Sequence, residues 1–391
     1  MKVAIVHEWL TTWAGSELVL EQMIACYPQA DLFAVIDFLE ESHRPRIQGK
    51  RARTTFIQRL PFARTRFWNY LPLIPLAVEQ LDLSGYDLVI SNSHAFAKGV
   101  LTGPDQVHVS YVHSPMRYAW DLQHQYLRHS DMGYGARGPV ARLGLHYLRL
   151  WDSRTANGVD AFAVNSHYVA RRLWKTYRRK ATVIHPPVDT ERFTLNERKD
   201  DYYLCASRMV SYKRMDLVVQ AFGRMPDKTL LVIGDGPERR RVQAGASSNV
   251  KFLGYQTDDA LREHLQKAKA LVFAAEEDFG ILPVEAQACG TPVIAYGKGG
   301  VSEIVRRPGT DHPTGILFME QTDEAIVDAV LRFERISDDF TPAQCRQNAL
   351  RFGSERFRIA LRSLVEASLN EYTARRPSSD AVPEPTKVTL E

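Results

Sequence analysis

This 391-residue sequence has few cysteines and lacks several patterns that define common classes of protein. Its four cysteines are scattered, and no two of them show the C-x-x-C spacing of a zinc or redox site. They therefore indicate reduced thiols of a cytoplasmic protein, not a disulfide framework. No apolar run approaches the roughly 20 residues that a membrane-spanning helix needs. The start, residues 1–7, predicts a buried strand instead of a signal peptide.

The sequence also lacks motifs that would hold a cofactor or a metal ion. No G-x-G-x-x-G follows a first strand, which argues against an NAD-dependent enzyme. No D-x-D carboxylate pair occurs anywhere, and the histidines show no ligand spacing with cysteines. We therefore expect no metal ion and no cofactor.

Acidic residues are absent from residues 42–78, although the whole chain has a net charge of only +4. Aromatic and aliphatic side chains, such as Phe62 and Trp68, interleave with the basic residues of this segment. The mixture favours an anionic membrane surface as partner over nucleic acid, with a solvated basic face as the alternative. We favour that alternative for a second basic cluster, residues 171–180. The basic residues of the first segment are Arg44, Arg46, Lys50, Arg51, Arg53, Arg59, Arg64 and Arg66.

What the chain does contain is an alternation of short apolar runs and helical stretches, typical of α/β folds with parallel sheets. The pattern stops at Pro186 and Pro187 and then restarts. We predict two doubly wound domains, residues 1–185 and 186–355, then a helix at 356–374 and a disordered tail at 375–391. The expected strands are residues 3–6, 87–91, 108–113, 161–166, 202–206, 229–233, 250–253, 270–275, 292–295 and 315–318.

The most informative segment, residues 277–295, follows one of these apolar runs and ends in the next. Glu277 comes where a strand ends, and Glu285 lies in the first turns of a helix that Pro283 is expected to open. Ligands of open α/β sheets bind at the carboxyl ends of the strands, where free N–H groups near Gly280 also point. Two carboxylates at such a place suit a hydroxyl-rich ligand such as a sugar and a ribose. An isolated pair of this spacing would equally be an acidic loop and an ordinary helix.

A second loop, residues 207–214, follows the first strand of the second domain. Its Arg208 and Lys213 suit a diphosphate, because an arginine fork binds phosphate oxygens in pairs and lysine adds a point charge. Gly234 begins a glycine turn after the next strand, and we interpret it as mainly structural, allowing close backbone approach in the crevice.

Together these segments resemble the donor site of glycosyltransferase family 4, a group of retaining nucleotide-sugar transferases with the GT-B architecture. The resemblance implies two facing Rossmann-like domains with a cleft between them, the first for the acceptor and the second for the donor. It implies that Arg208 and Lys213 neutralise the leaving nucleoside diphosphate and that Glu285 binds the ribose hydroxyls. Glu277 would bind the hydroxyls of the donor sugar. The backbone N–H groups that would assist it belong to Phe279, Gly280, Ile281 and Leu282.

The resemblance extends to two positions in the first domain. His113, just past a strand end, matches a family histidine that faces the donor sugar. Gly15 matches one of two adjacent glycines that approach phosphate or acceptor, but the other position is Ala14 here. Close backbone approach is therefore supported at one position only.

Within the family, the start His7-Glu8-Trp9-Leu10 and residues 112–120 resemble bacterial mannosyltransferases that assemble O-antigen and exopolysaccharide. This implies transfer of mannose from GDP-mannose, with a UDP-hexose as the alternative donor. It also implies a lipid-linked glycan acceptor and a peripheral position on the inner face of the cell membrane. Two other classes stay open: a non-catalytic sugar-nucleotide-binding protein, which would keep the same residues, and an NAD-dependent oxidoreductase.

Overall fold

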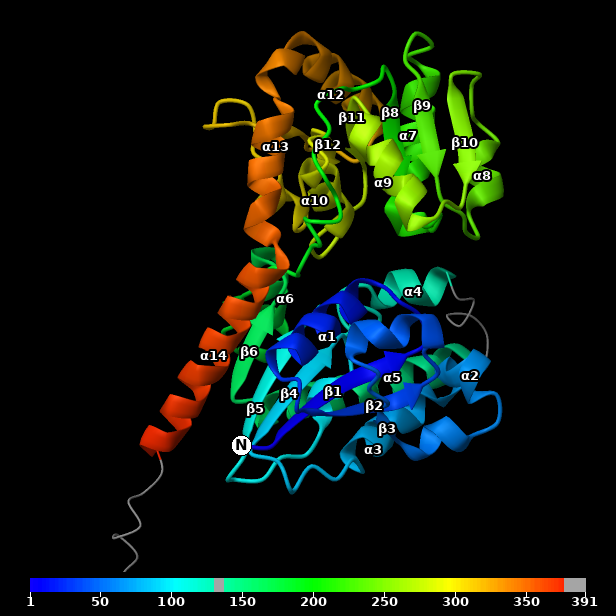
Figure 1. Ribbon diagram of the computed structural model, residues 1–391. Coiled ribbons are helices and arrows are strands. Elements are labelled where there is room, and N and C mark those ends of the chain that lie inside the picture. Colours follow the sequence, from blue (N-terminus) through cyan, green and yellow to red (C-terminus); the bar gives the residue numbers. More distant parts are fainter. Residues whose placement is uncertain (130–136, 376–391) are drawn as a thin grey trace, which may run out of the picture.

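The computed structural model describes residues 1–129 and 137–375. Two α/β domains lie one above the other in Figure 1, and the last helix runs from the upper domain down the side of the lower one. The two doubly wound parallel sheets predicted from the sequence are confirmed. Most of the predicted tail, residues 376–391, lies outside the described residues.

The N-terminal domain is built on a seven-stranded parallel sheet with the order β3-β2-β1-β4-β5-β6-β7. Its central strands are buried on both faces, which explains their near-continuous apolar runs. The chain order reverses between β1 and β4, and a crevice forms at the carboxyl ends of the strands there. The prediction missed β2 and β3. The strands are β1 (Val3–Leu10), β2 (Asp31–Asp37), β3 (Arg53–Thr54), β4 (Leu88–Ser93), β5 (Val107–Val112), β6 (Ala161–Val164) and β7 (Thr182–Val183).

The helices of this domain cover both faces of its sheet (Figure 1). The long helix α5 was not predicted. The N-terminal domain also contains the short 3-10 helices η3 (Phe67–Leu73) and η4 (Ala97–Gly99). A further 3-10 helix, η6 (Ser211–Lys213), lies in the C-terminal domain. The α-helices are α1 (Gly15–Cys26), α2 (Ala63–Arg66), α3 (Ile74–Glu79), α4 (Gln123–His129), α5 (Arg137–Thr155) and α6 (His167–Tyr177).

The C-terminal domain repeats the same design with six parallel strands in the order β10-β9-β8-β11-β12-β13. Every one of them coincides with an apolar run that the sequence marked as a strand. The order reverses between β8 and β11, so the loops after these two strands face a crevice. The strands are β8 (Tyr203–Ala206), β9 (Leu230–Ile233), β10 (Val250–Gly254), β11 (Ala270–Phe273), β12 (Val293–Tyr296) and β13 (Gly315–Phe318).

The helices that connect these strands lie on the two faces of the second sheet. α10 begins at Ile281, so Pro283 occupies its third position and not the first, as the sequence had suggested. The helices are α7 (Met215–Gly223), α8 (Arg239–Gln243), α9 (Asp258–Lys267), α10 (Ile281–Ala288), α11 (Val301–Ile304), α12 (Asp323–Arg335), α13 (Pro342–Ala349) and α14 (Ser354–Arg375).

The chain passes between the domains twice. The first sheet ends at Val183 and the second begins at Tyr203, on either side of the proposed boundary. Near the return crossing, the N–H of Val188 donates to the carbonyl of Phe352 (2.9 Å). α14 then packs against the N-terminal domain, where Phe357 and Leu361 are buried in the same core cluster as residues of β1 and α1. Among residues 1–129 and 137–375, no helix combines the length and the apolar character needed to cross a bilayer.

Candidate functional site

A single cavity of about 1130 Å³ lies between the two domains. Every site residue proposed from the sequence lines it. Two of them come from the N-terminal domain, and the others come from loops at the carboxyl ends of β8, β9 and β11 and from the start of α10. They are Gly15, His113, Arg208, Lys213, Gly234, Glu277, Phe279, Gly280, Ile281, Leu282 and Glu285.

Lys213 and Glu277 form an ion pair across the donor-side crevice. Both side chains are less than one-fifth exposed. Burial lowers the pKa of Lys213 to about 8, with Asp278 opposing this and Arg117 reinforcing it. The two residues expected to bind different parts of one ligand thus bind each other. A bound diphosphate would pair with Lys213 in place of Glu277. The Glu277 carboxylate would then be free to accept hydrogen bonds from sugar hydroxyls.

Glu285 lies on the first turns of α10, where the positive end of the helix faces the cavity. Burial raises the pKa of its carboxyl to about 7, and nearby Asp258 and Asp189 add to the rise while Arg192 opposes it. Among the described residues no cation forms an ion pair with this carboxylate, so hydroxyl donors of a ligand would stabilise its charged form. The first N–H groups of α10 have no acceptor within the helix and lie beside it.

Two glycines let backbones come together at the site. Gly234 has a φ of 128°, and a Cβ there would lie 1.9 Å from the carbonyl oxygen of Ser207, so only glycine fits. A Cβ on Gly15 would lie 2.9 Å from Cδ1 of Ile281. The beginning of α1 in one domain therefore nearly touches the beginning of α10 in the other.

His113 points into the cavity from the loop after β5. Its Nε2 lies 2.6 Å from Oδ1 of Asn92 and donates to it. Burial lowers the pKa of His113 well below its ordinary value, and the neighbouring His94 and His7 lower it further. His113 is therefore a neutral hydrogen-bonding group at neutral pH.

The cavity also exposes charged side chains that the sequence reading did not select. Arg117 lies four residues after His113 and close enough to Lys213 to lower its pKa. Arg46, His94 and Arg192 also line the cavity. Because these four residues come from separate segments of the chain, no local sequence pattern marks them as parts of one site. Two of them stood inside segments already singled out for other reasons: Arg117 in residues 112–120 and Arg46 in the basic segment, residues 42–78.

The acidic loop after β11 also joins the two domains. Asp278 pairs with Arg172 of α6 (2.5 Å) and with Arg117 (3.6 Å). Its carbonyl accepts a hydrogen bond from Ser166 Oγ (2.5 Å). Arg172 belongs to the second basic cluster, so our interpretation of that whole cluster as a solvated surface is wrong at this residue. We call the contacts between Asp278 and Arg172, Arg117 and Ser166 the interdomain contact.

Glu303 adds a second link between the domains. Its two carboxylate oxygens accept the first N–H groups of α6, from His167 (3.0 Å) and Tyr168 (3.1 Å). Burial raises the pKa of Glu303, but His185 and these two N–H groups outweigh it and lower the pKa below its ordinary value. The start of α6 is therefore held against α11 of the C-terminal domain.

No group of three or more histidine, cysteine, aspartate or glutamate side chains within residues 1–129 and 137–375 could hold a metal ion. The charged groups that face the cavity are instead a mixture of arginine, lysine and single carboxylates. The described part of the site can thus offset a diphosphate with protein cations.

Comparisons with known proteins agree with this geometry. The family model described as glycosyl transferases group 1 matches residues 187–352, and that described as Glycosyltransferase Family 4 matches residues 15–192. The Anabaena protein HepE in complex with UDP-glucose superposes with a TM-score of 0.69 at 17% identity, covering 94% of this chain and 100% of HepE. The fold is therefore that of the GT-B glycosyltransferases. The chain belongs to glycosyltransferase family 4.

Curated relatives match only part of this chain. D-inositol 3-phosphate glycosyltransferase of Mycolicibacterium paratuberculosis is 27% identical over 58% of this chain and 56% of the relative. A GDP-mannose-dependent monoacylated alpha-(1-6)-phosphatidylinositol monomannoside mannosyltransferase of Corynebacterium glutamicum is 32% identical over 38% of this chain and 47% of the relative. The chain thus spans about half the length of the curated relatives it matches.

Proposed function

We propose that this protein is a glycosyltransferase that moves a hexose from a nucleotide sugar to a hydroxyl group of an acceptor. The observation that carries the proposal is the gathering of two cations, Arg208 and Lys213, and two carboxylates, Glu277 and Glu285, on one wall of the interdomain cavity. Cations suit the diphosphate and carboxylates suit the hydroxyls of sugar and ribose. Family membership supports the same reading.

In this mechanism, the leaving diphosphate binds Arg208 and Lys213 at the ends of β8 and η6, with Arg117 reaching across from the other domain. These groups are in place before the reaction and stabilise the charge that develops on the phosphate oxygen. Glu277 and the N–H groups at the start of α10 orient the sugar, and Glu285 holds the ribose. Catalysis then rests on positioning and electrostatics, as expected for a retaining transfer without a covalent intermediate.

The donor that we propose is GDP-mannose, with a UDP-hexose as the second candidate. The name of the Corynebacterium relative supports the first, and the UDP-glucose in HepE supports the second. A thermal-shift panel of GDP, UDP and ADP with their sugar conjugates decides between them. A rise in melting temperature with one nucleotide family identifies the base, and no rise with any of them contradicts the proposal.

We further propose a lipid-linked glycan as acceptor and a peripheral position on the inner membrane face. The structure changes the basis of this idea, because Arg44 is buried in an ion pair with Asp37 (2.6 Å) and is no part of a basic surface. Exposed cations without an ion pair among the described residues remain at Arg59, Arg64 and Arg66. Exposed apolar side chains surround them: Phe56, Phe62, Trp68, Leu73 and Leu76.

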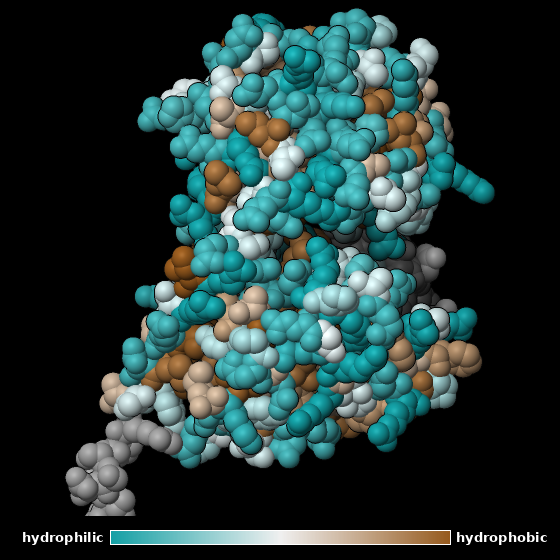
Figure 2. Space-filling model, in the orientation of Figure 1, coloured by the Kyte–Doolittle hydropathy of each residue, from teal (hydrophilic) through white to brown (hydrophobic). Residues whose placement is uncertain are grey.

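Helix α5 extends this surface. Val140, Leu143, Tyr147 and Leu150 are all exposed, and their spacing places them on one side of the helix. α5 shares a core cluster with η3 and α3, and Figure 1 shows it near α2. Figure 2 shows apolar side chains at the edge of the lower domain where Figure 1 places α2. An apolar stripe beside free arginines is the pattern of an interfacial helix on anionic lipid.

An enzyme and a non-catalytic binder can be separated directly. A nucleotide-sugar binder would show the same thermal shifts but would release no nucleoside diphosphate from the donor. We expect slow release with water as acceptor and faster release with an alkyl glycoside such as octyl α-D-mannopyranoside.

A further inference from the structure

The loop between β4 and η4, residues 93–98, is fixed at both ends by buried carboxylates. At its start, Oε1 of Glu8 on β1 accepts hydrogen bonds from Ser93 Oγ (3.1 Å), the N–H of His94 (2.8 Å) and the N–H of Phe96 (2.6 Å). Burial would raise the pKa of Glu8, but His94 and the backbone N–H groups lower it to about 2. Glu8 is thus a fixed negative charge.

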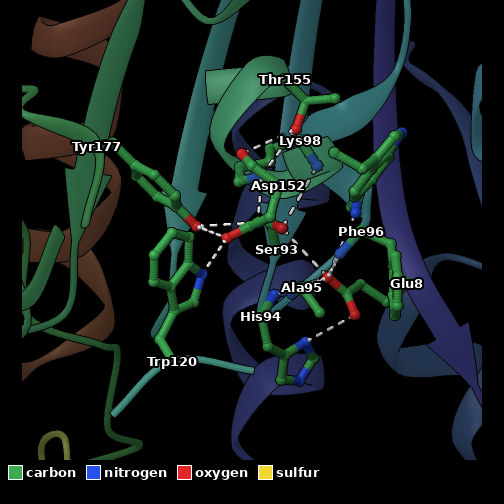
Figure 3. A network of polar contacts seen from close by, with 12 residues as sticks. Glu8, Ser93, His94, Ala95, Phe96, Lys98, Trp120, Asp152, Thr155 and Tyr177 are labelled. Atoms are coloured by element: carbon green, nitrogen blue, oxygen red, sulfur yellow. Dashed lines mark hydrogen bonds and ion pairs between the residues drawn. The ribbon is translucent and has the colours of Figure 1, made fainter. Parts of the chain in front are cut away.

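At the end of the loop, Lys98 is completely enclosed. Its Nζ lies 2.6 Å from Oδ1 of Asp152 on α5, and it also donates to Oγ1 of Thr155 (3.0 Å). Oδ2 of Asp152 in turn accepts from Trp120 Nε1 (2.7 Å) and from the hydroxyl of Tyr177 (2.9 Å). Figure 3 shows this continuous network, which leaves the loop little freedom to move.

His94 is the residue that this rigid loop presents to the cavity. Its Nδ1 faces Oε2 of Glu8 at 3.6 Å, and its ring stacks on Trp9 with 5.5 Å between centroids. The other edge of the ring points away from Glu8, as Figure 3 shows. The side chain is 34% exposed and lines the cavity, and no described residue forms a hydrogen bond with Nε2. The ring of His113 lies 5.0 Å away.

The surroundings of His94 differ from those of His108, a histidine with a structural role. His108 is buried, and both ring nitrogens have partners, Ser91 Oγ at 2.8 Å and the carbonyl of Gly158 at 3.3 Å. His94 has a carboxylate behind it and an open nitrogen towards the cavity. The carboxylate lies 3.6 Å from Nδ1, beyond hydrogen-bond distance, but its negative charge favours the protonated ring and so makes the open nitrogen more basic.

We propose that His94, positioned by Glu8, accepts the proton of the acceptor hydroxyl during glycosyl transfer. The inference rests on the proposed function and adds the acceptor-side group that the donor-side residues lack. The acceptor oxygen forms a bond to the anomeric carbon while its proton moves to Nε2 of His94. The bond from that carbon to the diphosphate breaks, and its electron pair leaves with the phosphate oxygen. Glu8 acts through His94 and is a positioning residue.

The charges around His94 suit this role. Glu8 and His7 face it from β1, Glu17 from α1 and His113 from the loop after β5. Burial lowers the pKa of His94, but Glu8 and Glu17 raise it above its ordinary 6.5. A base whose pKa lies near the working pH transfers protons most effectively. His113 stays neutral, so the two neighbouring histidines divide into a base and a hydrogen-bonding group.

The test compares His94→Gln, Glu8→Gln and a control, His146→Gln, which changes an exposed histidine on α5. Release of nucleoside diphosphate is measured at saturating donor from pH 5.5 to 9, with water and with octyl α-D-mannopyranoside as acceptors, so that the pH dependence of donor binding does not enter the profile. We expect His94→Gln to lower turnover by about 10²–10⁴-fold and to abolish the acid limb of the profile. Glu8→Gln should move that limb to lower pH, and the control should match the wild type.

Calorimetric titration of each variant with free GDP and UDP separates this role from a structural one. Unchanged nucleotide affinity in His94→Gln supports the proposal. A pH profile in His94→Gln with the wild-type acid limb overturns it, as does a loss explained by weaker nucleotide binding. If the wild type releases no nucleoside diphosphate from any donor, the proposed function fails and this inference fails with it. An active wild type with an unaffected His94→Gln variant contradicts the inference alone.

Discussion

The two walls of the cavity carry different charges, although they belong to domains with the same sheet order around the crevice. The lining residues of the N-terminal domain include Arg46, His94, His113 and Arg117 but no aspartate or glutamate. The C-terminal wall combines three cations, Arg192, Arg208 and Lys213, with six carboxylates: Asp189, Asp235, Asp258, Glu277, Asp278 and Glu285. The shared strand order of the two domains thus determines where the site lies. The residues of the loops after the strands determine what it binds.

The difference gives each wall a task. A wall with carboxylates can recognise hydroxyls of sugar and ribose, which a purely cationic wall cannot do. The N-terminal wall, with its arginine and histidine side chains, can contact the diphosphate from the opposite side and bind the acceptor. The predictions below test this division, from the largest expected effect to the smallest.

Removing a cation from the C-terminal wall, here called the donor wall, should slow the reaction strongly. Arg208→Ala and Lys213→Ala should each lower turnover by about 10²–10³-fold, as for loss of one preorganised charge-stabilising contact. Burial lowers the pKa of Lys213 to about 8, so its charge is lost as the pH rises through that value. The wild-type kcat/KM should therefore fall above pH 8. Steady-state kinetics measures these effects, and wild-type turnover in the Lys213→Ala variant would contradict the proposed diphosphate site.

The outer surface of the N-terminal domain should differ from that of the C-terminal domain in membrane binding. Replacing Arg59, Arg64 and Arg66 with alanine removes about 1 kcal/mol each near an anionic surface, or about 10²-fold in partition. Sedimentation with vesicles rich in phosphatidylserine measures it, and added salt should weaken the wild-type binding. The control is the triple alanine variant of the exposed C-terminal residues Arg240, Arg307 and Arg332. Equal losses of vesicle binding in both variants, or binding that does not depend on lipid charge, would show that this surface is an ordinary solvated face.

The two glutamates of the donor wall should separate nucleotide binding from transfer. Glu285→Ala should weaken binding of the free nucleotide by about 10–100-fold, the loss of charge-assisted hydrogen bonds. Glu277→Ala should leave that affinity nearly intact while transfer is abolished. Calorimetric titration decides this, and equal weakening in both variants would remove the division of labour.

Glu285 should also make nucleotide binding depend on pH. Its pKa is raised to about 7 in the free protein, and ribose hydroxyls favour the charged form. Bound nucleotide therefore lowers this pKa, so affinity rises as the pH increases towards 7 and levels off above it. In Glu285→Gln the rise should be absent. A rise of the same size in that variant would assign the dependence to another group.

The interdomain contact couples the two walls, and breaking it should have a smaller effect. Arg172→Ala removes the partner of Asp278 at 2.5 Å and should lower turnover by about tenfold, because the walls are then less exactly placed. Lys175→Ala, on the same helix and exposed, is the matched control. Nucleotide affinity of the donor wall should persist in Arg172→Ala. Wild-type turnover in this variant would show that the contact contributes nothing to the reaction.

The smallest expected effect is that of chelation. If protein cations on both walls offset the diphosphate, activity should persist in EDTA after bound metal has been stripped. Restoration of a dead, stripped enzyme by Mg²⁺ or Mn²⁺ would contradict the cation-free site.

The sequence located the cavity-lining residues of the C-terminal wall better than those of the N-terminal wall, for a physical reason. Arg208 and Glu277 come shortly after strands that are apolar on both faces, and Glu285 lies on the helix that follows the second of these strands, so a local pattern gives their position relative to the sheet. His94 follows a strand in the same way, but its importance comes from Glu8, 86 residues earlier on the neighbouring strand. Arg172 looked like one charge in a solvated run, and only the folded chain brings Asp278 to it. Pairing between distant segments leaves no trace in local spacing.

The missed strand β2 shows a different cause. Residues 31–37 are an apolar run between two aspartates, which is a strand signal as clear as those used elsewhere. The prediction passed over this strand, and it also passed over α5. The ion pair of Lys213 with Glu277 could not be predicted at all, since it joins loops after two different strands.

The path of α14 has a consequence for how the protein is made. Phe357, Leu361 and Val365 fill the core of the first domain, yet they are among the last described residues to leave the ribosome. The second domain has its whole sheet by Phe318, before these residues are synthesised. During translation, the first domain therefore waits with an apolar groove open beside β5 and α1, and the domain that begins first is completed last.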